Sequence, residues 1–244
     1  MTLAAIVLAA CGGGGGGGGP SASCDSIRKI DSYRYSVSLK LDAPSSPPSP
    51  DAGATSPAAA PLSDLADALT ALFSDFTLEG AYVAPDRSQA ILHFQDEELE
   101  VRSIGGQSWL RIGNTWQEEE PMDGKLLTPE VICEDIVAEV IGSLGRADSE
   151  GETVNGTLAD HYHLDEAQLR QLPDLLGTDL PERYALDLWL AKQGTWPVRL
   201  RIESSDVNEM GQPLGFALTM DVRDVGDRGI SVEPPVIAAA SPGS

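Results

Sequence analysis

The chain has 244 residues, and its 38 aspartates and glutamates against 16 lysines and arginines give a formal net charge of −22. A surface this acidic argues against nucleic-acid binding and against direct electrostatic docking on anionic lipid headgroups. Glycine and proline gather in two tracts, residues 12–19 and 43–61, and about 180 residues remain for one domain with its own core.

The first residues point to export and lipid attachment. Residues 1–10 are apolar but fall short of the about 20 residues that span a bilayer, and they suit the apolar core of a signal peptide. Leu8-Ala9-Ala10-Cys11 resembles a bacterial lipobox, whose cysteine carries fatty acyl chains such as palmitate. We therefore expect a signal peptide over 1–10 whose start is truncated, a lipidated Cys11, and a Gly-rich tether over 11–25. The expected location is the extracytoplasmic face of a bacterial cell membrane, with the protein held as a membrane-anchored lipoprotein.

Two further cysteines, Cys24 and Cys133, form an even pair in a chain predicted to be exported. Such a pair is a candidate disulfide, and closing a loop of about 100 residues would contribute up to about 4–5 kcal/mol. The alternative is two unpaired thiols, with Cys133 acting as a small core residue.

Alternation of apolar and polar residues dominates the domain. It is clearest over residues 33–41 and recurs in 76–82, 90–94, 99–101, 186–190, 198–202 and 216–222. Strands with one apolar and one polar face are typical of antiparallel sheets that are covered on one side. Turn-forming pairs such as Gly105-Gly106 and Gly113-Asn114 separate these strands.

Three segments, 62–73, 128–144 and 165–176, have helical periodicity instead. Thr128 suits the start of the second helix, Pro129 its first turn and Gly145 its end. The Pro/Ala/Ser-rich stretch 43–61 is expected to be a disordered insertion in a single domain over 26–236, with a disordered tail over 237–244. The predicted fold is α+β: a curved, open antiparallel sheet of about ten strands with about three helices over its concave apolar face.

Several short motifs occur in a characteristic order along the domain. They are Tyr33–Val37, the hairpin Ser108–Trp116, His161–Asp165 leading into a helix, Leu188–Leu190, Trp196–Arg199, and Val232–Pro235 as a closing strand. In this order they resemble the LolA-like half-barrels, most closely the LppX/LprG type of bacterial lipoproteins. The resemblance implies an apolar cavity between sheet and helices that binds acyl chains, and a role in holding or shuttling a lipid or a lipoprotein.

The residues expected to line that cavity are the apolar members of the strands and of the second helix. They are Tyr35, Val37, Leu39, Leu78, Leu92, Phe94, Val101, Leu110, Ile136, Val140, Leu188, Leu200, Phe216 and Leu218. The same residues would serve equally well as an ordinary filled core. In that case the chain would be a surface lipoprotein with a sensory or scaffolding role that binds a protein partner.

Few residues suggest other chemistry. His161, His163 and Asp165 alternate on one strand face, which suits Zn²⁺, although a solvated strand face ending in an Asp helix cap is the simpler interpretation. Runs of acidic residues at 96–98 and 118–120 are typical of solvated turns rather than catalytic pairs. Because no catalytic set has the required spacing, we expect no enzyme, no cofactor and no metal.

The four tryptophans, Trp109, Trp116, Trp189 and Trp196, are either core residues or aromatic contacts at a rim. If Leu110 and Ile112 face the core, Trp109 faces outward, which favours a surface role for that residue.

Overall fold

The computed structural model describes residues 20–42, 75–94, 97–120, 128–144, 149–170, 183–207 and 213–237. Its elements in chain order are α1 (Pro20–Ile27), β1 (Ser32–Asp42), β2 (Asp75–Val83), β3 (Arg87–Phe94), β4 (Glu97–Ile104), β5 (Gln107–Ile112), β6 (Thr115–Glu119), α3 (Pro129–Ile132), η1 (Cys133–Val137), α4 (Ala138–Leu144), β7 (Glu150–Val154), β8 (Thr157–Leu164), α5 (Glu166–Leu169), β9 (Arg183–Ala191), β10 (Pro197–Val207) and β11 (Pro213–Arg223).

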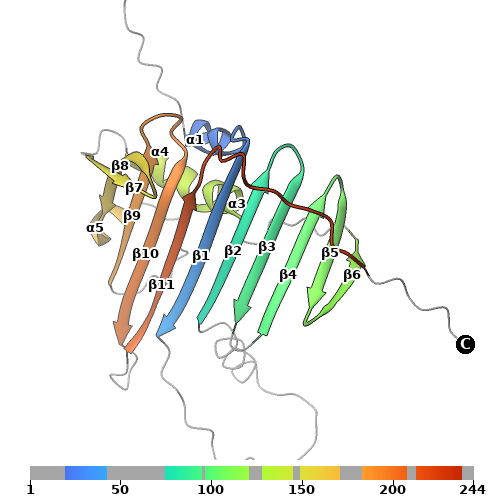
Figure 1. The fold of residues 1–244 in the computed structure, drawn as a ribbon. Coiled ribbons are helices and arrows are strands. Elements are labelled where there is room, and N and C mark those ends of the chain that lie inside the picture. Colours follow the sequence, from blue (N-terminus) through green and yellow to red (C-terminus); the bar gives the residue numbers. More distant parts are fainter. Residues whose placement is uncertain are drawn as a thin grey trace, which may run out of the picture.

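The strands form one antiparallel sheet in the order β6-β5-β4-β3-β2-β1-β11-β10-β9-β8-β7 (Figure 1). Two runs of sequential neighbours, β1 to β6 and β7 to β11, are joined where the first strand pairs with the last. In the described part of the chain, β6 and β7 end this order, so the sheet is open. The predicted α+β half-barrel is therefore confirmed, with eleven strands where about ten were expected.

The predicted helix 128–144 is present as α3, η1 and α4, which follow one another without a break from Pro129 to Leu144. Pro129 occupies the first turn as expected, but the Thr128 side chain makes no capping hydrogen bond. Cys133–Val137 is π-helical, which the apolar spacing does not reveal. Tyr33 of β1 donates its hydroxyl hydrogen to Glu130, so the start of this helix is tied to the sheet.

The core lies between this helix and one face of the sheet, called here the inner face. Val37, Leu188 and Leu200 on the strands and Val140 on α4 are fully buried in it. Gly80 of β2 sits opposite Tyr35 of β1, and a Cβ at Gly80 would lie 2.1 Å from the tyrosine ring. Glycine is therefore required there for the Tyr35 ring to lie across the neighbouring strand.

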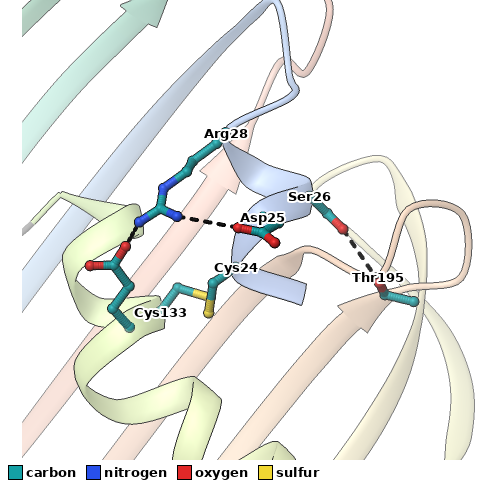
Figure 2. Close-up of a disulfide and its surroundings, with 7 residues drawn as sticks. Cys24, Asp25, Ser26, Arg28, Cys133 and Thr195 are labelled. Carbon is teal, nitrogen blue, oxygen red and sulfur yellow. Dashed lines mark hydrogen bonds and ion pairs between the residues drawn. A yellow bond between two sulfur atoms is a disulfide. The ribbon is translucent and has the colours of Figure 1, made fainter. Parts of the chain in front are cut away.

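The expected pairing of Cys24 with Cys133 is present as a disulfide, with the two Cα atoms 5.5 Å apart (Figure 2). It joins α1 to the π-helical turn of the long helix. Arg28 of α1 reinforces this contact through ion pairs with Glu134 and, at 3.2 Å, with Asp25.

Ordered structure begins earlier in the chain than the sequence indicated. Residues up to 25 were assigned to the tether, whereas α1 starts at Pro20. The reason is that Cys24 and Ile27 are buried in the core, so the end of the predicted tether is part of the domain.

The expected closing strand Val232–Pro235 is not a strand, and this part of the prediction is wrong. Residues 230–233 instead cross the outer face of β2 to β4, where Ile230 and Val232 pack against Ala81 (Figure 1). Arg87 and Arg102 donate hydrogen bonds to the carbonyl oxygens of residues 232 and 233. The two following prolines lack the N–H groups that a sheet ladder needs.

Several expectations lie outside the described residues: Cys11, the insertion 43–61, the helix 62–73, the helix end at Gly145 and the tail after residue 237. Of the predicted helix 165–176, the structure describes α5, which covers Glu166–Leu169. Among the described helices, none is long and apolar enough to cross a membrane.

Candidate apolar binding face

The inner face carries one continuous apolar row across the sheet. Its members, one per strand from β8 to β5, are Tyr162, Leu188, Leu200, Met220, Val37, Leu78, Leu92, Leu99 and Ile112. They share a face because directly opposed residues of antiparallel strands point the same way. The alternation found in the sequence agrees with this row on β1 to β4 and on β9 to β11, whereas it was not recognised on β5 and β8.

All the expected cavity residues on strands lie on this face, and the two on the helix pack against it, but their burial differs greatly. The buried ones, with at most 6% of their surface exposed, are Tyr35, Val37, Leu78, Val140, Leu188 and Leu200. These side chains belong to a filled core between the sheet and α1, α3, η1 and α4. Where these residues lie, the inner face is covered by a filled core, which is the alternative to a cavity that the sequence analysis left open.

A second group borders that core. Leu39, Leu92, Phe94, Ile136, Phe216 and Leu218 are partly buried and pack against it. These residues lie at the margins of the helix-covered area, on β1, β3, β11 and η1.

The last two expected residues, Val101 on β4 and Leu110 on β5, lie outside the core cluster of the described residues. They are half-buried, as is Leu99, and Ile112 has 54% of its surface exposed. In Figure 1 the helices α1, α3 and α4 gather near β1, β10 and β11, α5 lies beside β8 and β9, and no described helix is drawn over β4 to β6. We call Leu99, Val101, Leu110 and Ile112 the β4–β5 patch.

Leu99 and Ile112 were not among the predicted cavity residues, although the necessary signal was present. Both are in phase with Val101 and Leu110 in the period of two along their strands. Leu99 was already part of the alternation at 99–101, and continuing the period of two from Leu110 to the end of the strand would have included Ile112.

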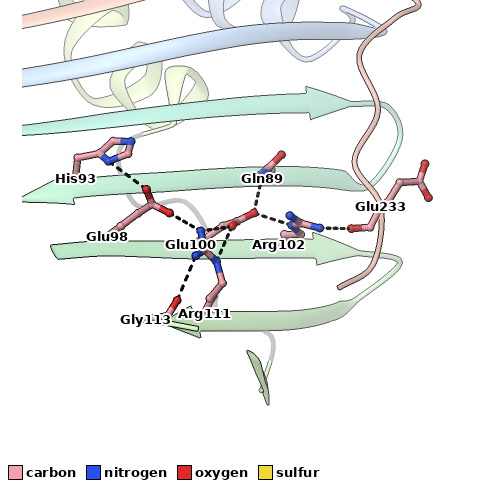
Figure 3. Close-up of polar contacts among 8 residues, drawn as sticks. All are labelled: Gln89, His93, Glu98, Glu100, Arg102, Arg111, Gly113 and Glu233. Atoms are coloured by element: carbon pink, nitrogen blue, oxygen red, sulfur yellow. Dashed lines mark hydrogen bonds and ion pairs between the residues drawn. The ribbon is translucent and has the colours of Figure 1, made fainter. Parts of the chain in front are cut away.

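On the outer face of β3 to β5, one buried carboxylate links side chains from all three strands (Figure 3). Glu100 is 3% exposed and accepts hydrogen bonds from Gln89, from Arg102 at 2.7 Å and from Arg111 at 2.9 Å. Burial alone would raise the pKa of Glu100, but these hydrogen bonds and the charge of Arg102 together lower it. Arg111 also pairs with Glu98, so this member of one predicted acidic run stabilises the sheet.

His161, His163 and Asp165 do not converge. Both histidines instead hydrogen-bond to Asp187 on β9, at 2.9 Å and 2.8 Å. Partial burial alone would raise the pKa of Asp187, but the hydrogen bonds and charges of the two histidines together lower it. Asp165 caps α5 through a capping box with Gln168, as the simpler interpretation required. The described residues contain no group of three or more possible ligands arranged for a metal ion.

The tryptophans are largely core residues. Trp189 and Trp196 are buried in the main core, and Trp116 is half-buried with the Arg102 guanidinium 4.8 Å from its ring centroid. Trp109 points to the outer face as its neighbours required, but only 7% of its surface is exposed. The surface role expected for Trp109 is therefore wrong.

No family model matches the chain, and neither does any curated protein. Among solved structures, the crystal structure of LprF from Mycobacterium bovis is similar, with 13% sequence identity, 88% of this chain and 94% of that chain covered, and a TM-score of 0.43. The structure of MucB in complex with MucA(peri) has 13% identity, covers 83% of this chain and 53% of that chain, and gives a TM-score of 0.28. Because both scores are low, the fold assignment rests on the strand order and helix placement. On that basis the chain has the open half-barrel architecture that the LolA-like resemblance implied.

Proposed function

We propose that the chain is a binding protein that holds or shuttles an acyl-chain ligand, a lipid or a lipoprotein, on the inner face of its half-barrel. The observation that carries the proposal is that the apolar row continues past the packed core. Leu92 borders the core, Leu99 lies outside it, and Ile112 is 54% exposed. The β4–β5 patch is thus an apolar surface next to a core, which is the usual character of a site for an apolar ligand.

The binding mechanism is desolvation of the acyl chain against the β4–β5 patch and the adjoining Leu92 and Phe94. Each methylene group removed from water contributes about 0.8 kcal/mol, so a chain of moderate length is retained without any charged contact. No chemical step is part of this role, and the protein acts as a carrier rather than as an enzyme.

The proposed setting is the outer side of a bacterial membrane, with the protein anchored through acyl chains on Cys11. The motif around Cys11 supports this placement, together with the disulfide between Cys24 and Cys133, since disulfides persist in oxidising compartments. The anchor leaves the acidic domain free to stand away from the membrane surface.

Native mass spectrometry of the full chain from a bacterial host tests the proposal, with a matched pair of variants. Ile112→Glu places a charge in the β4–β5 patch, whereas Leu158→Glu places one on β8, where leucine is equally exposed at 55%. We expect a co-purifying lipid on the wild-type chain and on Leu158→Glu, and a clear loss from Ile112→Glu. Equal lipid content in both variants, or none on the wild type, overturns the proposal. A defined protein co-purifying in place of lipid would identify the alternative, a protein-binding module.

A further inference from the structure

The outer face of the sheet carries two adjoining pockets opposite the packed core, each with a volume of about 470 Å³. Both include Lys40 on β1 and Glu203 on β10. One pocket is also lined by Ser38, Arg199, Arg201 and Thr219, and the other by Arg183 at the start of β9.

The register explains why a sheet surface is hollow here. Ser38, Thr219 and Arg201 form one cross-strand row over β1, β11 and β10, and Lys40, Ala217 and Glu203 form the next. In these two rows β11 contributes the short side chains of Thr219 and Ala217, which lie between Lys40 on β1 and the long side chains of Arg201 and Glu203 on β10. Long side chains on both sides of short ones leave a hollow above the short side chains.

The charge of this surface is opposite to that of the whole molecule. The chain has a net charge of −22 and 16 lysines and arginines, yet basic side chains line both pockets, and Glu203 is the acidic residue they share. Arg199 is paired with Asp221 at 2.7 Å, and Arg201 with Glu203. Within the described residues, Lys40 and Arg183 are exposed and have no ion-pair partner.

We propose that these pockets bind a phosphate group of a ligand, with Lys40 and Arg201 as its cationic contacts and the hydroxyls of Ser38 and Thr219 as further donors. Phosphate carries up to two negative charges and three acceptor oxygens, which suits several donors converging from neighbouring strands. The phosphate belongs either to a soluble phosphomonoester or to a phospholipid headgroup. Because the pockets and the β4–β5 patch are on opposite faces of the sheet, this site is separate from the acyl-chain site proposed above.

The experiment follows backbone amide signals of the full chain carrying Cys11→Ser, so that no lipid anchor contributes. In one arm glycerol phosphate is added, and in the other vesicles of phosphatidylcholine with or without phosphatidic acid. We expect saturable changes confined to β1, β10 and β11. Changes with glycerol phosphate identify a soluble source, and changes only with phosphatidic acid vesicles identify a headgroup. No saturable change in either arm overturns the proposal.

Two variants and a matched control make the result specific. Lys40→Gln and Arg201→Gln each remove one charged contact, and each is expected to weaken binding about tenfold. Lys29→Gln removes the same charge from an exposed lysine after α1 that does not line either pocket. Equal weakening by Lys29→Gln shows that only net charge is sensed and overturns the assigned site. Unchanged amide spectra of the free variants establish that their folds are intact.

Discussion

At the scale of single residues, Glu100 is the clearest case of a charge that stabilises the sheet. Its carboxylate is buried on the outer face of β4 and receives hydrogen bonds from three side chains on β3, β4 and β5. A buried carboxylate is tolerated only when such partners replace its lost hydration. The position follows an acidic run in the sequence, and neither composition nor spacing distinguishes it from its exposed neighbours.

Replacing Glu100 by glutamine removes the charge that Arg102 and Arg111 share while keeping the size of the side chain. We expect the free energy of unfolding to fall by about 1–3 kcal/mol, because two guanidinium groups lose their common carboxylate. Urea unfolding at neutral pH measures the effect, and Glu119→Gln on the exposed surface of β6 is the matched control. Equal stability of the two variants would show that the Glu100 contacts add nothing.

At the scale of elements, the helix 128–144 could be predicted because its apolar stripe, its proline and its length all agree. The helix α1 could not, since its eight residues are small or polar apart from a single isoleucine at the end. Its place in the domain depends on the disulfide and on the burial of Ile27, which are tertiary contacts. The segment 230–233 was assigned to a strand because extended chain looks the same whether it joins a sheet or crosses one.

The link between α1 and the long helix gives a prediction at this scale. Changing both Cys24 and Cys133 to serine removes a cross-link that closes a loop with a sequence separation of 109 residues. Chain entropy then predicts a loss of about 4–5 kcal/mol in the free energy of unfolding. Urea unfolding with and without reductant measures it: reductant should destabilise the wild-type chain and leave the double variant unchanged. A wild-type chain insensitive to reductant would contradict the prediction.

At the scale of the whole molecule, the period of two identifies which side chains face inward, and the structure agrees for every expected cavity residue on a strand. The alternation does not show how much of the sheet the helices cover, so it could not separate the buried Val37 and Leu200 from the half-buried Val101 and Leu110. The alternation also does not predict the order of the strands in the sheet. Lys40 and Arg201 are far apart in sequence and line the same pocket only because β1 and β10 both flank β11.

At low pH, the stability of the whole chain should depend on two carboxylates that are hydrogen-bonded in the folded state, the buried Glu100 and the half-buried Asp187. Glu100 and Asp187 both have a lowered pKa in the folded state. Their contribution is therefore fully present above the unfolded carboxyl pKa of about 4, and it is lost as the pH falls through the folded values. Protonation of the many exposed acidic groups acts in the opposite sense, because it relieves the repulsion from the net charge of −22.

Comparison with a double variant, Glu100→Gln with Asp187→Asn, separates these two effects, because the surface repulsion is nearly the same in both chains. We expect the wild type to be clearly more stable at pH 7, and the difference in the free energy of unfolding to shrink steadily below about pH 4. Urea unfolding of both chains at several pH values from 7 to 3 measures this difference. A gap that stays constant over the whole range would mean that the hydrogen bonds to these carboxyls do not depend on their charge.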